Sequence, residues 1–198
     1  MEKGLGERLA RIESRLAHLR ELDVPRPGAS NFVDDDDRRL PGYVMFGADL
    51  HRHENRAVPE HALQRLEAAM KCPLPEGFRG FLSRIGTGSG PYYGIPWSKL
   101  ERCASPACAQ AFPAGSSGPI YRDEDDDGIE HGYLVITDMG CGDEVAVITA
   151  GQSRGHVVFL LYNSAEWQLG PEFLDFYENW IERGIEGLSR QPHPRMIV

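Results

Sequence analysis

The sequence of 198 residues has no long hydrophobic run. The longest, Val157–Tyr162, is far shorter than the ~20 residues that a membrane-spanning helix needs. The first residues, MEKGLGERLARIES, are charged throughout and lack the apolar centre of a signal peptide. We therefore expect a cytoplasmic protein that does not associate with membranes.

Cysteine is scarce. The chain has four cysteines, and we expect them to be reduced thiols in that compartment. Cys103 and Cys108 enclose a four-residue gap, but no histidine lies near them in the sequence to complete a zinc site. The chain has no Walker A sequence and no dinucleotide fingerprint, we expect no Gly-x-Ser-x-Gly elbow, and nothing places Glu76, Asp143 or Glu144 as paired acids around a cleft. The sequence therefore indicates no metal, no cofactor and no enzyme, with a metal-dependent hydrolase as the least favoured alternative.

The net charge of -9 is unevenly distributed. Residues 1–120 carry 15 acidic and 16 basic side chains, a balance of +1. Residues 121–198 carry 15 acidic and 5 basic side chains, a balance of -10. The electric field of such a segment repels nucleic acid and attracts basic partners. The alternative is that the acidic excess only keeps the protein soluble.

An acidic run, Asp123-Glu124-Asp125-Asp126-Asp127, precedes Gly128 and begins like an EF-hand calcium loop. Leu134 stands where that loop requires a bidentate glutamate, and no helices flank it, so we exclude an EF-hand. A solvated loop, a partner-binding patch and a looser cation site remain as alternatives.

His51 and His53 lie beside Glu54. Residues two apart share a face of a strand, so these side chains could approach one metal ion. The spacing reveals no further ligands, and we predict ordinary surface histidines.

The spacing of apolar residues predicts amphipathic helices. Leucine and isoleucine recur every three or four residues over 5–22, and similar stripes indicate helices over 58–71, from Pro75 to about Ile85, and over 171–183. Three short β-branched runs, Tyr133–Thr137, Val145–Thr149 and Val157–Tyr162, are apolar on both alternating faces. They predict antiparallel strands that are covered on both sides. The fold class is α+β, a single domain with an antiparallel sheet flanked by helices and preceded by an N-terminal amphipathic helix.

We divide the chain into an N-terminal helix with a flexible acidic linker (1–42), an α+β domain (43–187) and a C-terminal tail (188–198). The linker is inferred because residues 23–42 contain prolines, glycines and four consecutive aspartates without periodicity. We expect the first helix to pack onto the domain, with dimerisation as the alternative, and a chain beginning at Tyr43 to fold without it.

Three signatures occur in a fixed order. Residues 74–94 read LPEGFRGFLSRIGTGSGPYYG, glycine turns follow at 140–143 and 151–155, and residues 173–181 read FLDFYENWI. Over roughly residues 58 to 185, the chain resembles the SUKH superfamily, which includes bacterial toxin-immunity proteins and yeast cell-wall-assembly regulators. The resemblance implies a protein that acts by binding, and no catalytic set is carried over.

We therefore interpret the chain as a non-catalytic immunity protein that neutralises a cognate bacterial toxin domain, with a nuclease as one candidate for the toxin. The alternative is a regulatory scaffold that binds a host protein. The expected partner is a toxin with a basic surface, without direct nucleic-acid contact, and the protein is expected to be a monomer or weak dimer. The candidate partner-binding residues are acidic: Asp123, Glu124, Asp125, Asp126, Asp127, Asp143 and Glu144.

Overall fold

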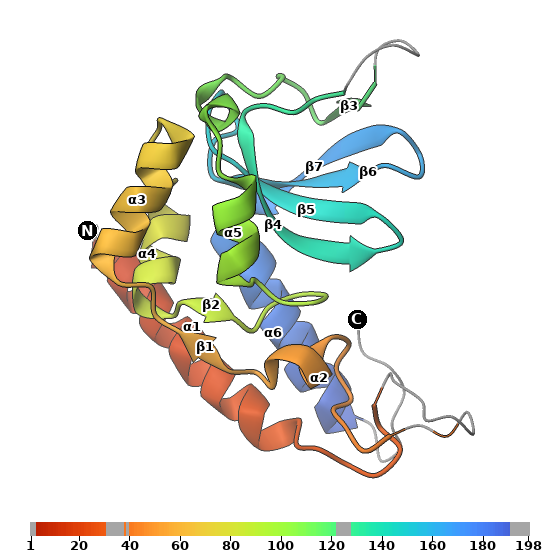
Figure 1. Ribbon diagram of the computed structural model, residues 1–198. Helices are drawn as coiled ribbons and strands as arrows, with labels where there is room; N and C mark the ends of the chain where they lie inside the picture. Colours follow the sequence, from red (N-terminus) through yellow and green to blue (C-terminus); the bar gives the residue numbers. More distant parts are fainter. Residues whose placement is uncertain (1–2, 31–37, 39, 122–127, 191–198) are drawn as a thin grey trace.

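The computed structural model describes residues 3–30, 38, 40–121 and 128–190, and it confirms the predicted α+β fold. Its centre is a five-stranded antiparallel sheet with the order β3-β7-β6-β5-β4 (Figure 1). The strands are β3 (Ser117–Pro119), β4 (Tyr133–Gly140), β5 (Asp143–Ile148), β6 (His156–Leu161) and β7 (Glu166–Glu172). The short strands β1 (Asn55–Arg56) and β2 (Thr87–Gly88) form a separate antiparallel pair.

Prolines mark the start of several helices. The helices are α1 (Lys3–Leu22), α2 (Ala48–His51), α3 (Glu60–Met70), α4 (Glu76–Arg84), α5 (Trp97–Cys103), the 3₁₀ helix η1 (Pro106–Ala109) and α6 (Phe173–Arg190). Helices α3, α4 and α5 begin directly after Pro59, Pro75 and Pro96. Proline suits this position because its φ is fixed and a helix start does not need its missing N–H.

The three predicted strands correspond to β4, β5 and β6, which pair as antiparallel neighbours. Strands β3 and β7 were not predicted. In β7, the sequence EWQLGPE buries only Trp167, so it lacks the apolar alternation of the central strands. Helix α6 continues to Arg190, beyond the predicted end at 183, and its Leu188 is buried.

Both faces of the sheet are covered, as predicted. One face packs against the helices in the main core, and its strand residues are Leu134, Ile136, Val145, Val147 and Val157. The other face belongs to a second core, in which Phe112, Ile120 and Ile129 cover Val135, Ala146, Ile148, Val158 and Leu160. The alternation of these residues between the two cores follows from the two-residue period of a strand.

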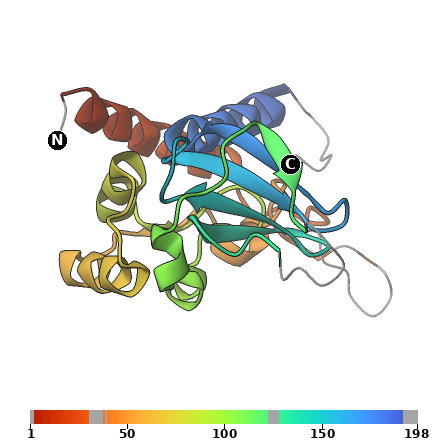
Figure 2. The same ribbon diagram turned by 90° about the horizontal axis from the view of Figure 1, so that it is seen from above.

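Helix α1 packs lengthwise on α6, with both helices running in the same direction (Figures 1 and 2). Its apolar stripe is almost completely buried in the main core, comprising Leu9, Ile12, Leu16 and Leu19. Ion pairs between the two helices flank this stripe: Arg8 and Arg11 contact Glu178 at 2.8 and 2.9 Å, and Arg15 pairs with Glu182. The predicted packing of the first helix onto the domain is confirmed.

Asp23, which sequence reasoning placed at the start of a linker, is 1% exposed. Its carboxylate accepts hydrogen bonds from the backbone N–H groups of Val44 at 2.9 Å and Met45 at 3.2 Å. It also contacts Nε2 of His53 at 2.8 Å. Asp23 therefore connects the end of α1 to the segment after residue 42. The division of the chain at residue 42 stays a prediction, but these contacts argue against independent folding of a chain that begins at Tyr43.

The prediction of surface histidines is wrong for this pair. His53 is 0% exposed and His51 is 9% exposed, and both rings pack edge-on or tilted against Trp180. Burial and the neighbouring His53 lower the pKa of His51 to about 4, against weaker opposing effects of the Gly90 carbonyl, Asp23 and Asp49. His51 is therefore neutral at pH 7.

We expect Asp23→Ala to lower the free energy of unfolding by about 3 kcal/mol, because two backbone N–H groups and a histidine lose their buried acceptor. Urea unfolding followed by circular dichroism measures the change. Glu21→Ala, on the exposed surface of α1, serves as the control and should change stability by less than about 0.5 kcal/mol. Equal effects of the two substitutions would show that Asp23 does not connect α1 to the domain.

The low pKa of His51 predicts that stability falls as the pH is lowered from about 6.5 to 4. Over this range the unfolded chain binds a proton that the folded protein excludes, and the loss can reach about 3 kcal/mol. Urea titrations at pH 7 and pH 5 should show a smaller difference for His51→Gln than for the wild type. His18→Gln, on exposed α1, should keep the wild-type difference; an unchanged difference in His51→Gln would contradict the assignment.

Candidate partner-binding site

A hollow of about 480 Å³ opens on the sheet face that carries the second core. We call it the tyrosine hollow, and its lining includes the aromatic and charged residues Tyr121, Tyr133, Tyr162, Glu130, Glu144 and Arg102. Tyr133 begins β4, Glu144 lies on β5, and Tyr162 directly follows β6. Tyr121 and Glu130 are neighbours of Ile120 and Ile129, which cover this face. The hollow is therefore formed by the strands together with these covering residues.

One tyrosine of the hollow is held in place by a hydrogen bond, and burial keeps two of them neutral. The Tyr133 hydroxyl donates a hydrogen bond of 2.6 Å to the Ile129 carbonyl, which fixes the ring against the covering segment. Burial, with smaller effects of Tyr162 and Glu144, raises the pKa of Tyr133. Burial also raises the pKa of Tyr162 to about 12. Both phenols are therefore neutral at pH 7 and offer aromatic faces together with polar hydroxyl ends.

Glu144 is half-buried and paired rather than free. The Lys99 ammonium, 4% exposed, contacts the Glu144 carboxylate at 2.9 Å and also pairs with Asp138. Burial lowers the pKa of Lys99, but the hydrogen bonds to Asp138 and Glu144 outweigh it and raise the pKa above its usual value. The lysine thus ties α5 to the β4–β5 hairpin and fixes one carboxylate of the hollow.

Of the other predicted site residues, the structure describes only Asp143. Asp143 is half-buried at the start of β5, and its Oδ1 accepts hydrogen bonds from the side-chain and backbone N–H groups of Asn163 at 3.1 and 3.3 Å. Asp123, Glu124, Asp125, Asp126 and Asp127 lie outside the described residues. Their described neighbours are at the hollow, since Tyr121 lines it and Gly128 lies against the Tyr121 ring.

Sequence reasoning missed the tyrosines, Glu130 and Lys99. Tyr133 and Tyr162 stand at the ends of predicted strands, and strand periodicity gives only the face on which each lies. Lys99 is on a helix that was not predicted, and only the packing of α5 beside β4 brings it to Glu144.

The prediction that the chain has no Gly-x-Ser-x-Gly elbow overlooked this pattern in the glycine turn at 151–155. Residues 151–155, Gly-Gln-Ser-Arg-Gly, match the Gly-x-Ser-x-Gly pattern of a nucleophile elbow. That elbow requires a strand followed by a helix, whereas these residues form the turn between antiparallel β5 and β6. The Arg154 side chain is used structurally, because it donates hydrogen bonds to the carbonyls of Pro73, Leu74 and Thr149. The match is a hairpin turn.

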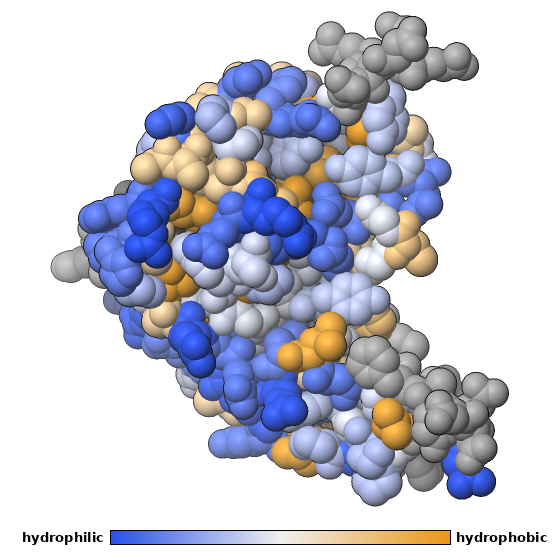
Figure 3. Space-filling view, in the orientation of Figure 1, coloured by the Kyte–Doolittle hydropathy of each residue, from blue (hydrophilic) through white to orange (hydrophobic). Residues whose placement is uncertain are grey.

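Three further properties of the described residues concern surface character, metal-binding clusters and membrane-spanning helices. Hydrophilic residues predominate on the face shown in Figure 3, and strongly hydrophobic residues lie in separate groups. Within the described residues, no three His, Cys, Asp or Glu side chains gather as a metal site would require. None of the described helices combines the length and apolar character needed to cross a membrane.

Comparison with known proteins gives one match. The model of the SMI1 / KNR4 family (SUKH-1) matches residues 57–179, more than half of the chain. No curated protein and no solved structure shows a significant match. The matched region starts just before α3 and ends within α6, so it contains the sheet and the tyrosine hollow.

We expect Lys99→Ala to lower the free energy of unfolding by about 1–2 kcal/mol, since it leaves the carboxylates of Asp138 and Glu144 together without a counterion. The partial exposure of both carboxylates keeps the loss below that of a fully buried pair. Thermal and urea unfolding measure it. Lys71→Ala, at the exposed end of α3, is the matched control and should be close to wild type; a similar loss in both variants would contradict the role of Lys99.

Proposed function

The chain belongs to the SMI1 / KNR4 family (SUKH-1), and we propose that it acts by binding a protein partner without catalysing a reaction. More specifically, it is an immunity protein of the cytoplasm that neutralises a cognate bacterial toxin domain. The superfamily contains such immunity proteins as well as yeast cell-wall-assembly regulators. The partner has a basic surface, as expected for a nuclease or another toxin that acts on an anionic substrate.

The tyrosine hollow is the observation that carries this proposal. Tyr121, Tyr133 and Tyr162 offer aromatic rings, and the exposed Glu130 offers a carboxylate, within one recess of about 480 Å³. A lysine or arginine side chain placed over an aromatic ring is attracted by about 0.5–2 kcal/mol, and a nearby carboxylate adds a charge-assisted hydrogen bond. Tyrosine and arginine are also enriched among the residues that dominate binding energy at interfaces. The recess therefore suits a basic side chain of a partner.

The charge of the surrounding sequence also favours a basic partner. In the sequence, Tyr121 and Arg122 precede the Asp123–Asp127 run, within a segment whose overall balance is -10. Complementary fields raise association rates between proteins and are screened within about 8 Å at physiological ionic strength. The acidic run would accelerate encounter, while the hollow would hold a basic side chain after contact.

The test begins with the tagged protein, used to capture partners from native lysate for identification by mass spectrometry. The captured protein is then purified, and its association is followed by stopped-flow at two salt concentrations. We expect added salt to slow association. Asp125→Lys/Asp126→Lys/Asp127→Lys should lower the on-rate by roughly tenfold with a smaller effect on the off-rate.

A second variant tests the hollow separately. Glu130→Lys reverses an exposed charge in its lining, and it should raise the off-rate of the partner by roughly tenfold, or about 1.4 kcal/mol. Glu21→Lys makes the same change on α1 and should leave binding unchanged. A captured toxin whose association is independent of salt and whose binding is unchanged by the triple variant and by Glu130→Lys would overturn this binding mode. A captured partner that is not a toxin would favour a regulatory scaffold.

A further inference from the structure

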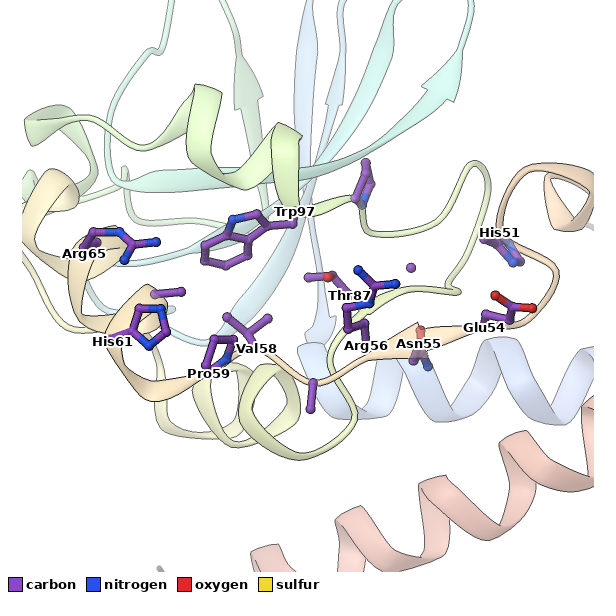
Figure 4. A pocket seen from close by; sticks show the side chains of 14 residues that line it. His51, Glu54, Asn55, Arg56, Val58, Pro59, His61, Arg65, Thr87 and Trp97 are labelled. Atoms are coloured by element: carbon purple, nitrogen blue, oxygen red, sulfur yellow. The ribbon is translucent and has the colours of Figure 1, made fainter.

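A second recess lies among α3, α5 and the β1–β2 pair, and it has the opposite charge (Figure 4). We call it the cationic cleft; its volume is about 580 Å³, and its principal lining residues are His51, Glu54, Arg56, His61, Arg65 and Trp97. It shares no lining residue with the tyrosine hollow. The charge of the cleft is unexpected in a chain whose net charge is -9.

The basic side chains of the cleft have no ion-pair partner within the described residues. Arg56 lies on β1, while His61 and Arg65 lie one turn apart on the same side of α3. All three side chains are exposed, and among the described residues none forms an ion pair or a side-chain hydrogen bond. Glu54 is the one acidic residue in the lining. A guanidinium group offers parallel N–H donors that match the oxygens of phosphate.

The opposite end of the cleft contains a buried hydrogen-bond donor without a partner. His51 is 9% exposed and lines the cleft, and its Nδ1 accepts a hydrogen bond of 3.1 Å from the backbone N–H of His53. Because the ring is neutral, its proton is on Nε2. By geometry, Nε2 has no hydrogen-bond partner within the described chain, although a backbone interaction with Gly90 raises the pKa of the ring. Because Nε2 is itself buried, His51 closes this end of the cleft without offering the donor to a ligand.

An aromatic platform lies between the two arginines. Along the cleft, Figure 4 shows the Trp97 indole between Arg65, from α3, and Arg56, from β1. Trp97 begins α5 and is half-buried against the main core, so its position is fixed while part of the ring stays accessible. Indole rings stack with nucleic-acid bases at about 1–3 kcal/mol per base. The volume of the cleft is within the roughly 300–1,000 Å³ typical of small-molecule sites.

We propose that the cationic cleft binds a mononucleotide, with its base stacked on Trp97 and its phosphate attracted by Arg56 and Arg65, which lie on either side of the indole. Two guanidinium groups beside an indole match a phosphate joined to an aromatic base, whereas an acidic peptide would use the charges and leave the indole without a role. The cationic cleft is separate from the tyrosine hollow, and nucleotide binding there does not depend on the proposed toxin partner.

Isothermal titration calorimetry of the full chain with the four ribonucleoside monophosphates tests the proposal. At least one should bind saturably with a dissociation constant between micromolar and low millimolar. The matching nucleoside and inorganic phosphate should each bind at least tenfold more weakly, because each provides half of the recognition. A hexaglutamate peptide tests the acidic-peptide alternative under the same conditions.

Variants locate the site. Arg56→Gln and Arg65→Gln change exposed side chains and should each weaken nucleotide binding at least fivefold without altering the melting temperature of the free protein. Trp97→Leu should weaken it similarly, and the arginine variants decide the question if Trp97→Leu does not fold. Arg183→Gln, an exposed position on α6 outside the cleft, is the matched control and should bind as the wild type.

The proposal is overturned if none of the four nucleotides binds saturably. It is also overturned if inorganic phosphate binds as tightly as the nucleotide, or if hexaglutamate binds more tightly than any nucleotide. Nucleotide binding that is equally strong in Arg56→Gln, Arg65→Gln and the wild type would place the ligand elsewhere and would equally refute it.

Discussion

The fold depends on one buried carboxylate. Asp23, 1% exposed, is satisfied only while the N–H groups of Val44 and Met45 and the ring of His53 remain in place around it. A buried charge without such partners is strongly unfavourable, so the end of α1 and the segment that leads to α2 must adopt their positions together. Met45 also reaches α6, where the end of its side chain lies against Gly184. The N-terminal helix is thereby part of the same structural unit as the family domain.

The covering of the sheet on both faces determines where recognition can occur. The helices occupy one face, and Phe112, Ile120 and Ile129 occupy most of the other. What remains open is a border of the second core, where the ends of β4 and β6 place Tyr133 and Tyr162 beside the covering segment. Aromatic rings and carboxylates at such a border can contact a partner without exposing the apolar core, which agrees with the mainly hydrophilic surface.

Charge is segregated at two levels in this protein. Along the sequence, acidic excess is confined to residues 121–198, and in space the cationic cleft and the tyrosine hollow have separate linings. Lys99 neutralises Glu144 and Asp138, whereas Arg56 and Arg65 have no counterion within the described residues. The difference follows from burial, because the side chain of Lys99 is enclosed and must be paired, while exposed arginines remain hydrated until a ligand binds.

Local periodicity determined much of the fold. The leucine spacing of α1, the alternation in β4, β5 and β6, and the ordered motifs that resemble the SUKH superfamily are all properties of contiguous residues, and the sequence reveals them directly. Strands β3 and β7 escaped prediction because they carry little apolar alternation and form through pairing with existing strands. Only the tertiary structure decided that Asp23 meets His53 and that His51 is buried. It also decided that Tyr133 and Tyr162 line one hollow. These contacts join residues far apart in the sequence, and they depend on how whole elements pack, which no local pattern encodes.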